Sequence, residues 1–234
     1  MAQLLCRDLT LGYDQKSILE HLSFEVNAGD YLCIVGENGS GKSTLMKTIL
    51  GLQPPLAGTV ERGEGLRANE IGYLPQQTVV QRDFPASVEE IVLSGRQGRT
   101  GILPFYRRVD RESAEKNMER MGITEFRKRC YRELSGGQQQ RVLARALCAT
   151  EKMLLLDEPV SGLDPKVTAD MYQLIQGLND EGITIIMISH DIAAAVDCAT
   201  HILHIGKKVF FGTKEQYKNS RLGEWFLQEE SVNA

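Results

Sequence analysis

Hydrophobic and polar positions alternate with a period of two in two segments near the start of the chain, Leu9–Tyr13 and Leu22–Val26. Such alternation is typical of strands with one buried face. Three other segments are almost continuously apolar, namely Tyr31–Val35, Met153–Leu156 and Ile183–Ile188. Continuous apolar runs of this length are typical of strands that are buried on both faces of a parallel sheet.

The apolar positions between these runs take helical spacing. Between residues 87 and 148, Val88, Ile91 and Val92 fall on one helical face. Further helices are predicted around Asp110–Met121, Val167–Leu178 and Ile192–Ala199. Because strands alternate with helices, the sequence predicts an α/β fold with a mainly parallel sheet.

Composition narrows the class of protein. The 234 residues fit one large domain or two small ones. With 31 acidic and 27 basic residues the net charge is −4, which argues against a protein that neutralises nucleic-acid phosphates. We find neither a signal peptide nor an apolar run long enough to span a membrane. Five scattered cysteines predict reduced thiols, and the sequence therefore predicts a soluble cytoplasmic protein.

A glycine-rich segment between the first continuous apolar run and the helix after it carries the clearest chemistry. Its glycines allow backbone N–H groups to converge on phosphate oxygens, and the following helix points its positive end at them. Lys42 is expected to place its positive charge near the β and γ phosphates, and the Ser43 hydroxyl is expected to bind Mg²⁺. The candidate nucleotide-binding residues are Gly36, Asn38, Gly39, Ser40, Gly41, Lys42, Ser43 and Thr44.

Two acidic residues follow the apolar run Met153–Leu156. Ligands bind at the carboxyl ends of parallel strands, so Asp157 is expected beside the phosphates, where it would hold Mg²⁺ through water. Glu158 is then placed to act as general base on the attacking water. Taken alone, the same pair could be a solvated acidic turn.

A second glycine-rich helix start is the most informative motif. The segment from Leu134 to Arg141 reads LSGGQQQR and leads into an apolar helix through Val142 and Leu147. On this octapeptide and the two motifs before it, the chain resembles the nucleotide-binding subunit of ATP-binding cassette (ABC) transporters, over essentially its whole length. The resemblance implies that Ser135, Gly136, Gly137 and Gln138 bind the ATP held by a second subunit.

The resemblance assigns the remaining motifs. Tyr13 matches the aromatic residue that stacks on adenine, although a strand aromatic in the core is the alternative. Gln76 matches the glutamine that senses the γ-phosphate through Mg²⁺, with Gln77 one position away, and His190 matches the histidine that contacts the γ-phosphate. The loop at the dimer interface corresponds to Ser161, Gly162, Leu163 and Asp164.

The resemblance also implies an architecture. It implies a P-loop NTPase core with a mainly parallel sheet and an N-terminal antiparallel β subdomain, at about residues 1–82 and 149–234. An inserted helical subdomain is expected at about 83–148. Two subunits would form a homodimer that closes on ATP and Mg²⁺ (held by Ser43, Gln76 and Asp157) and reopens after hydrolysis. The dimer would lie at the cytoplasmic face of the membrane, against integral membrane permease subunits fed by a solute-binding protein.

The transporter class depends on one segment. Asp83–Arg96 resembles the corresponding stretch of bacterial zinc, manganese and iron importers. Importers of siderophores, haem or cobalamin are an alternative, as is a soluble ABC ATPase of iron–sulfur assembly. The interval between Ser43 and Ser135 carries no sustained heptads, which argues against ABC ATPases of DNA maintenance.

Three minor features are predicted to be structural. His201 and His204 could suggest a metal pair, but they fall in a predicted strand with nothing nearby to complete a site. Gly206-Lys207-Lys208 is predicted to be a hairpin turn, and Arg127–Arg129 a solvated surface.

Overall fold

The computed structural model describes residues 2–14, 16–63, 65–67, 70–76, 85–97, 105–140, 150 and 152–233. The chain forms two compact units, one of Met1–Ala68 with Asn179–Ala234 and one of Asn69–Leu178. The subdomain boundaries expected from the sequence stay a prediction. Residues 77, 83–84 and 141–148, which the sequence analysis used, lie outside the described residues.

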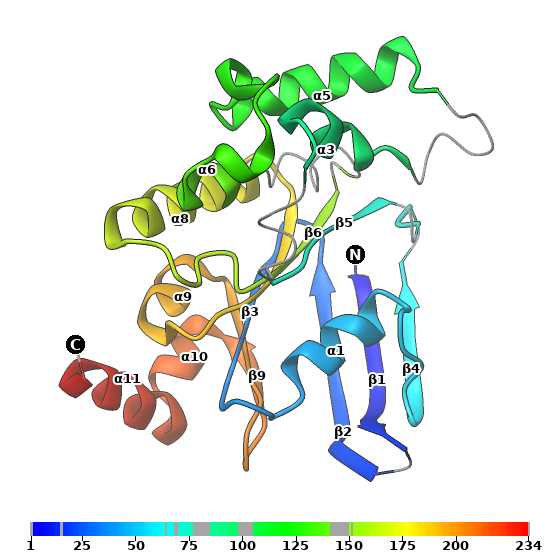
Figure 1. The fold of residues 1–234 in the computed structure, drawn as a ribbon. Helices are drawn as coiled ribbons and strands as arrows, with labels where there is room; N and C mark the ends of the chain where they lie inside the picture. Colours follow the sequence, from blue (N-terminus) through cyan, green and yellow to red (C-terminus); the bar gives the residue numbers. More distant parts are fainter. Residues whose placement is uncertain are drawn as a thin grey trace. The chain divides into compact units, whose positions relative to one another are not determined.

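The first unit contains an antiparallel sheet with the strand order β2–β1–β4 (Figure 1). The central strand β1 (Ala2–Tyr13) pairs with β2 (Lys16–Asn27) and with β4 (Ala57–Arg62). Leu9, Leu22 and Phe24 point into the core, as the alternating pattern predicts. Both predicted strands are confirmed, and both extend further than the alternation indicated.

Three parallel strands form the centre of the same unit. Strand β3 (Tyr31–Val35) lies between β7 (Thr184–Ile188) and β8 (His201–His204), and every residue of β3 and β7 is buried. Strand β9 (Phe210–Thr213) returns antiparallel to β8, so the predicted hairpin turn between them is confirmed. The apolar runs thus become strands covered on both faces.

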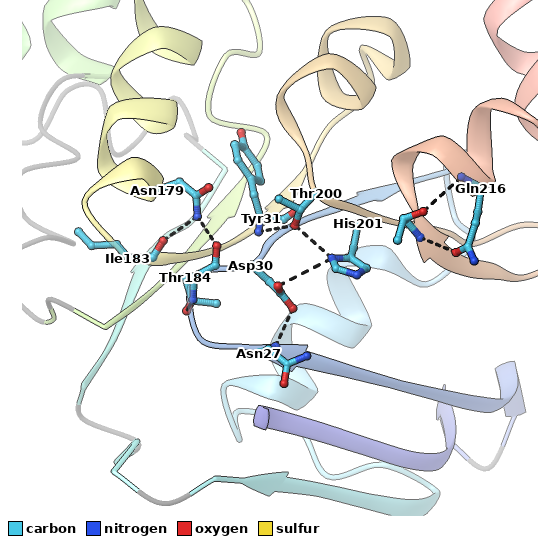
Figure 2. A network of polar contacts seen from close by, with 11 residues as sticks. Asn27, Asp30, Tyr31, Asn179, Ile183, Thr184, Thr200, His201 and Gln216 are labelled. Atoms are coloured by element: carbon cyan, nitrogen blue, oxygen red, sulfur yellow. Dashed lines mark hydrogen bonds and ion pairs between the residues drawn. The ribbon is translucent and has the colours of Figure 1, made fainter. Parts of the chain in front are cut away.

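Polar contacts link the residues at the starts of β3 and β8 to one another, as Figure 2 shows. The Asp30 carboxylate accepts the N–H of Asn27 at 2.7 Å and lies 3.9 Å from the imidazole of His201. The Tyr31 N–H donates to the Thr200 hydroxyl at 2.9 Å, and that hydroxyl lies 3.1 Å from Nδ1 of His201. These bonds satisfy main-chain groups where β3 and β8 begin and hold the two strands in register.

Four helices complete the described part of the first unit. Helix α1 (Lys42–Ile49) follows the glycine-rich loop, and α9 (Ile192–Cys198) links β7 to β8. Helices α10 (Lys214–Lys218) and α11 (Arg221–Asn233) follow β9 and are not predicted by the apolar spacing. A reciprocal pair of bonds between Thr213 and Gln216 caps the start of α10 (Figure 2).

The second unit joins a parallel strand pair to several helices. Strand β5 (Ile71–Leu74) pairs with β6 (Met153–Asp157). The described helices are α3 (Val88–Ser94), α5 (Arg108–Arg120), α6 (Gly136–Gln140) and α8 (Pro165–Asp180), with 3-10 turns at Thr124–Phe126 and Tyr131–Glu133. Parallel pairing in both units and the antiparallel sheet confirm the predicted fold class. Among the described helices, none is both long and apolar enough to cross a bilayer.

Two arginines connect the helices of this unit. Nε of Arg96, just beyond α3, lies 2.8 Å from Oδ1 of Asp110 in α5, and both side chains are largely buried. Arg127 reaches back to Glu89 of α3 at 2.7 Å. The prediction that Arg127 is merely solvated is therefore wrong, because the turn that carries it folds back on α3.

Candidate functional site

The glycine-rich loop leaves the carboxyl end of β3 along a path that requires glycine. At Gly36 φ is 136°, and the carbonyl oxygen of Ile205 lies only 1.9 Å from where a Cβ would stand. Any side chain at this position would collide with the main chain that follows β8. Gly41, at φ 103°, takes the left-handed conformation at the start of α1.

The Lys42 side chain lies inside this loop and bonds to its main chain. Its side chain is buried, and Nζ donates to the carbonyl oxygens of Gly36 at 2.7 Å and Glu37 at 2.8 Å. In the same loop, the buried Ser40 hydroxyl has no hydrogen-bond partner among the described residues, whereas Ser43 is exposed on the first turn of α1. A buried ammonium and an unsatisfied hydroxyl beside a helix N-terminus fit an anion such as phosphate.

An apolar edge lies next to the loop. Tyr13 ends strand β1, its ring is about half exposed, and its hydroxyl accepts a hydrogen bond from Thr44 at 3.3 Å. Cγ2 of Ile18, on β2, lies 3.4 Å from where a Cβ on Gly41 would stand. The alternative that Tyr13 is a core residue is therefore wrong. The sequence analysis missed Ile18, whose only signal was an apolar residue on an exposed strand position.

His190 follows β7, the strand next to β3. The N–H of the preceding residue, Ser189, donates to the Ile34 carbonyl at 3.2 Å, and its hydroxyl accepts the Asp191 N–H at 3.1 Å. The Asp191 carboxylate in turn caps α9 by accepting the Ala194 N–H at 2.9 Å. This short turn presents the exposed His190 at the carboxyl ends of β7 and β3, where the glycine-rich loop also begins.

The second unit brings Gln76 and Glu158 together. Because β5 and β6 are parallel and Leu74 is opposite Leu156, residues shortly after both strands meet at one edge. Nε2 of Gln76 donates to Oε2 of Glu158 at 2.6 Å. Whether Gln76 or Gln77 senses the γ-phosphate stays a prediction, because Gln77 lies outside the described residues.

The two acidic residues after β6 differ in environment. Asp157 is buried, and its charge adds to the effect of burial in raising the pKa of Tyr73 to about 12. Glu158 is half-buried and has a φ of 51°, which is rare for a residue other than glycine. The chain therefore turns sharply between a buried carboxylate and a more accessible one.

The segment at the start of α6 is held by its own side chains. The Ser135 hydroxyl accepts the Gln138 N–H at 3.4 Å, and the Gln138 side chain accepts the Ser135 N–H at 3.0 Å. A Cβ on Gly137 would stand 2.7 Å from Cγ1 of Val167 in α8, so this glycine permits close packing. Gly136 begins the helix, and Ser135 stays exposed.

The loop between β6 and α8 is a pair of turns. The Ser161 N–H donates to the Glu158 carbonyl at 3.2 Å, Gly162 has a φ of 74°, and Leu163 follows half-buried. Asp164 caps α8 by accepting the Val167 N–H at 3.0 Å. Asp164 thus has a local structural role, and a contact across a dimer stays a prediction.

The predicted site residues therefore fall into two sets, each assembled within one unit. The phosphate loop, Tyr13 and His190 belong to the first unit, whereas Gln76, Asp157 and Glu158 belong to the second. Apart from Tyr13, which ends the antiparallel strand β1, both sets lie beyond the carboxyl ends of parallel strands, where α/β proteins bind ligands. That the two sets act on one nucleotide stays a prediction.

Comparison with known protein families gives one match, to the model described as ABC transporter, over residues 19–161. The manganese transport system ATP-binding protein MntB of Bacillus subtilis is 39% identical, over 89% of this chain and 85% of that protein. The zinc uptake system ATP-binding protein ZurA of Listeria innocua is 34% identical, over 88% and 84%. The chelated iron transport system membrane protein YfeB of Yersinia pestis is 38% identical, over 88% and 72%.

The similar solved structures also belong to ABC transporters. An ABC transporter assigned to the metal-chelate type, in an inward-facing conformation, superposes with a TM-score of 0.85 at 31% identity, over 95% of this chain and 87% of that chain. A dimeric ATP-binding cassette bound to ADP and phosphate after hydrolysis superposes with a TM-score of 0.72 at 25% identity, over 89% and 98%.

Proposed function

Because this chain belongs to the ABC transporter family, whose cassettes bind and hydrolyse ATP, we propose that it is the ATPase subunit of a membrane importer for a transition-metal ion. The observation that carries the ATPase part is the phosphate loop around Lys42, together with the paired Gln76 and Glu158 at another strand edge. The proposal that the cargo is a transition-metal ion is supported by the relatives named for manganese, zinc and chelated iron.

ATP would bind to the loop by replacing the protein's own acceptors. Phosphate oxygens would take the place of the Gly36 and Glu37 carbonyls as acceptors for Lys42 Nζ, and the Ser40 hydroxyl would gain a partner. The adenine ring would stack on the half-exposed ring of Tyr13, next to Ile18. Main-chain N–H groups of residues 39–44 would cradle the phosphates.

The donor set fits Mg²⁺, which prefers hard oxygen ligands and usually keeps several waters. The Ser43 hydroxyl, the Gln76 carbonyl oxygen and the Asp157 carboxylate would hold the ion. When bound, Mg²⁺ neutralises charge on the β and γ phosphates and so makes the phosphorus easier to attack.

For hydrolysis, we expect water to take the place of the Gln76 amide on Glu158. While the Gln76 amide donates to Glu158, that carboxylate oxygen is occupied by a proton donor other than water. Glu158 would then accept a proton from water while the water oxygen attacks the γ-phosphorus. The bond between that phosphorus and the oxygen that leaves with ADP breaks in the same step. His190 would donate to a γ-phosphate oxygen and stabilise its developing charge.

The second subunit would complete the site. Ser135, Gly136, Gly137 and Gln138 would contact the γ-phosphate held by the partner copy, and residues 161–164 would line the contact between the copies. The homodimer would close on ATP, reopen after hydrolysis, and transmit both motions to integral membrane permease subunits that receive the metal from a solute-binding protein. In this arrangement the subunit would lie at the cytoplasmic face of the membrane.

A second candidate cargo is a metal chelate, such as a siderophore complex or haem, because one similar solved structure is assigned to the metal-chelate type. The test is ATP-dependent uptake by vesicles that carry the complex reconstituted with its permease. Free manganese, zinc and iron are offered in parallel with a ferric siderophore and haem. We expect uptake of at least one free ion, and none with the Lys42→Ala subunit. Uptake of chelates alone would refute the metal-ion proposal in favour of the second candidate.

A further inference from the structure

His204 is a buried titratable residue to which neither the motifs nor the proposed reaction gives a role. It ends strand β8, is 1% exposed, and stands opposite Val35, the last residue of β3. The next residue, Ile205, donates its N–H to the Val35 carbonyl at 2.9 Å. The segment that starts at His204 therefore runs alongside the start of the phosphate loop.

That segment is in direct contact with the loop. The Ile205 carbonyl oxygen is the atom 1.9 Å from where a Cβ on Gly36 would stand, and so it packs on the bare Cα of that glycine. Gly36 also provides one of the two carbonyls that hold Lys42. A displacement of residues 204–206 would consequently move the loop and its lysine, because close-packed main chain has no room to absorb it.

On its other side the His204 ring is held by the two C-terminal helices. Nδ1 of His204 lies 2.9 Å from the hydroxyl of Tyr217 in α10, and Tyr217 is fully buried. The ring of Phe226 in α11 is tilted against the imidazole with a centroid distance of 4.5 Å. Trp225 lies edge-on to Phe226 at 4.5 Å and is about half exposed. The rings of Trp225, Phe226 and His204 therefore form a continuous series that starts at the surface of α11. It ends next to Ile205, the residue that contacts the phosphate loop.

The charge state agrees with this geometry. Burial lowers the pKa of His204, an effect to which the Lys42 charge adds and which the Glu37 charge opposes. Both of these charged groups belong to the phosphate loop and α1. The charges of the loop therefore act on His204, whose Nδ1 lies against the Tyr217 hydroxyl.

We propose that His204 is a positioning residue that couples helices α10 and α11 to the phosphate loop, so that its contact with Tyr217 sets how tightly the loop binds nucleotide. The inference rests on the proposed function, because it assumes that the loop binds ATP. The coupling would give α10 and α11 a part in nucleotide binding. These helices would act through His204 and Ile205 and not by touching the loop themselves.

The test compares Tyr217→Phe, which removes one hydroxyl and keeps the packing, with His204→Phe. Kd for ATP and for ADP is measured by calorimetry on the whole subunit. We expect Tyr217→Phe to weaken binding about two- to tenfold, the range that one neutral hydrogen bond allows. His204→Asn keeps a hydrogen-bonding group near the position of Nδ1 and should restore part of the affinity that His204→Phe loses. Tyr106→Phe makes the same chemical change as Tyr217→Phe but in the second unit, so it is the matched control and should bind like the wild type.

Trp225 gives a readout that a purely structural role would not change. It is the single tryptophan of the chain, so fluorescence excited selectively at tryptophan, and not at tyrosine, reports on α11. We expect ATP to change this fluorescence in the wild type and in Tyr106→Phe, and the change to be absent in Tyr217→Phe at saturating ATP. Should Tyr217→Phe bind with wild-type Kd, or keep the full fluorescence change, the coupling is refuted. A wild-type subunit that binds ATP without any change in fluorescence refutes it as well.

The two proposals fail in distinguishable ways. If the wild type binds no ATP, or if Lys42→Ala binds it equally well, the proposed nucleotide site is wrong. If the wild type binds ATP through Lys42 and only the effects of Tyr217 and His204 are missing, the coupling alone is wrong.

Discussion

At the scale of single residues, Glu158 shows how backbone conformation and side-chain contacts together aim one carboxylate. A residue other than glycine at a φ of 51° costs on the order of 1 kcal/mol or more, and the fold must compensate for that cost elsewhere. The buried strand β6 fixes the chain before it, and the hydrogen bond from Gln76 fixes its side chain. The direction of this carboxylate is therefore imposed by the fold.

Replacing Glu158 with Gln tests its role as a base. The amide keeps the shape and can still accept the hydrogen bond from Gln76, but it cannot take a proton from water. We expect ATP binding to persist and kcat to fall by about 10²–10⁴, the share attributable to general-base catalysis. Because ATP is then not consumed, the closed dimer should accumulate on a sizing column.

The control for this substitution is Glu119→Gln, which makes the same chemical change at an exposed position of α5. It should hydrolyse ATP at the wild-type rate. Near-normal turnover by Glu158→Gln would show that another group activates the water.

At the scale of the elements, a largely buried ion pair joins the end of α3 to α5 in the second unit. Asp110 accepts a bond from Arg96 at 2.8 Å and another from the Arg107 N–H at 2.9 Å, which caps the start of α5. Burial by itself raises the pKa of Asp110, but the Arg96 guanidinium and the Arg107 N–H hold that pKa below its ordinary value. The ionised carboxylate is thus the form that the fold stabilises.

Asp110→Asn should lower the free energy of unfolding by about 1.5–3 kcal/mol, the range for one hydrogen bond between charged groups, because it removes the negative charge that the largely buried Arg96 guanidinium contacts. A depressed carboxyl pKa contributes stability that is complete above the ordinary Asp pKa of about 4 and is lost as the pH falls through the folded-state value. The difference between variant and wild type should therefore be constant at neutral pH and shrink below about pH 4. Urea unfolding at several pH values measures it.

Glu112→Gln provides the comparison for Asp110→Asn. Glu112 pairs with Arg108 on the exposed face of the same helix, at 2.7 Å, so its loss should cost less than about 1 kcal/mol. Equal losses for the two variants, or a difference that does not change with pH, would contradict the importance given to the buried pair.

At the scale of the whole molecule, the proposed reaction needs two copies of the chain, and Ser135 separates binding from closure. Ser135→Arg puts a long cationic side chain at an exposed position that is expected to face the partner's nucleotide. We expect Kd for ATP of the single subunit to change by less than about threefold, because the phosphate loop is untouched. ATP-induced dimerisation and ATP hydrolysis should both be lost.

Sedimentation with and without ATP measures the dimerisation, and Glu119→Arg controls for added charge in the same unit. Loss of ATP binding in the Ser135→Arg monomer would mean that Ser135 acts on its own subunit's nucleotide. An ATP-dependent dimer of normal stability would remove this residue from the subunit contact.

The sequence by itself determined strands β1–β3 and β6–β8, the glycine-rich loop after β3 and the acidic pair after β6, but it did not predict β4, β5 or β9. These features follow from local physics: a continuous apolar run must be buried on both faces, and the loop at Gly36 and Gly41 needs conformations that favour glycine. Carboxylates directly after a buried strand must emerge at its carboxyl end, as Asp157 and Glu158 do. Each conclusion depends on residues within a few positions of one another.

Only the tertiary structure decided the partners of these residues. His201 and His204 look alike in the sequence, but they differ by three positions in a strand and so face opposite sides, one toward Asp30 and Thr200 and the other toward Tyr217. The bond between Gln76 and Glu158 likewise joins residues far apart in the chain. Such contacts depend on which strands pair and in which register. Local alternation shows which face of a strand is buried, but it does not identify the partner strand, because the free energy that selects the pairing comes from burying both faces of the sheet at once.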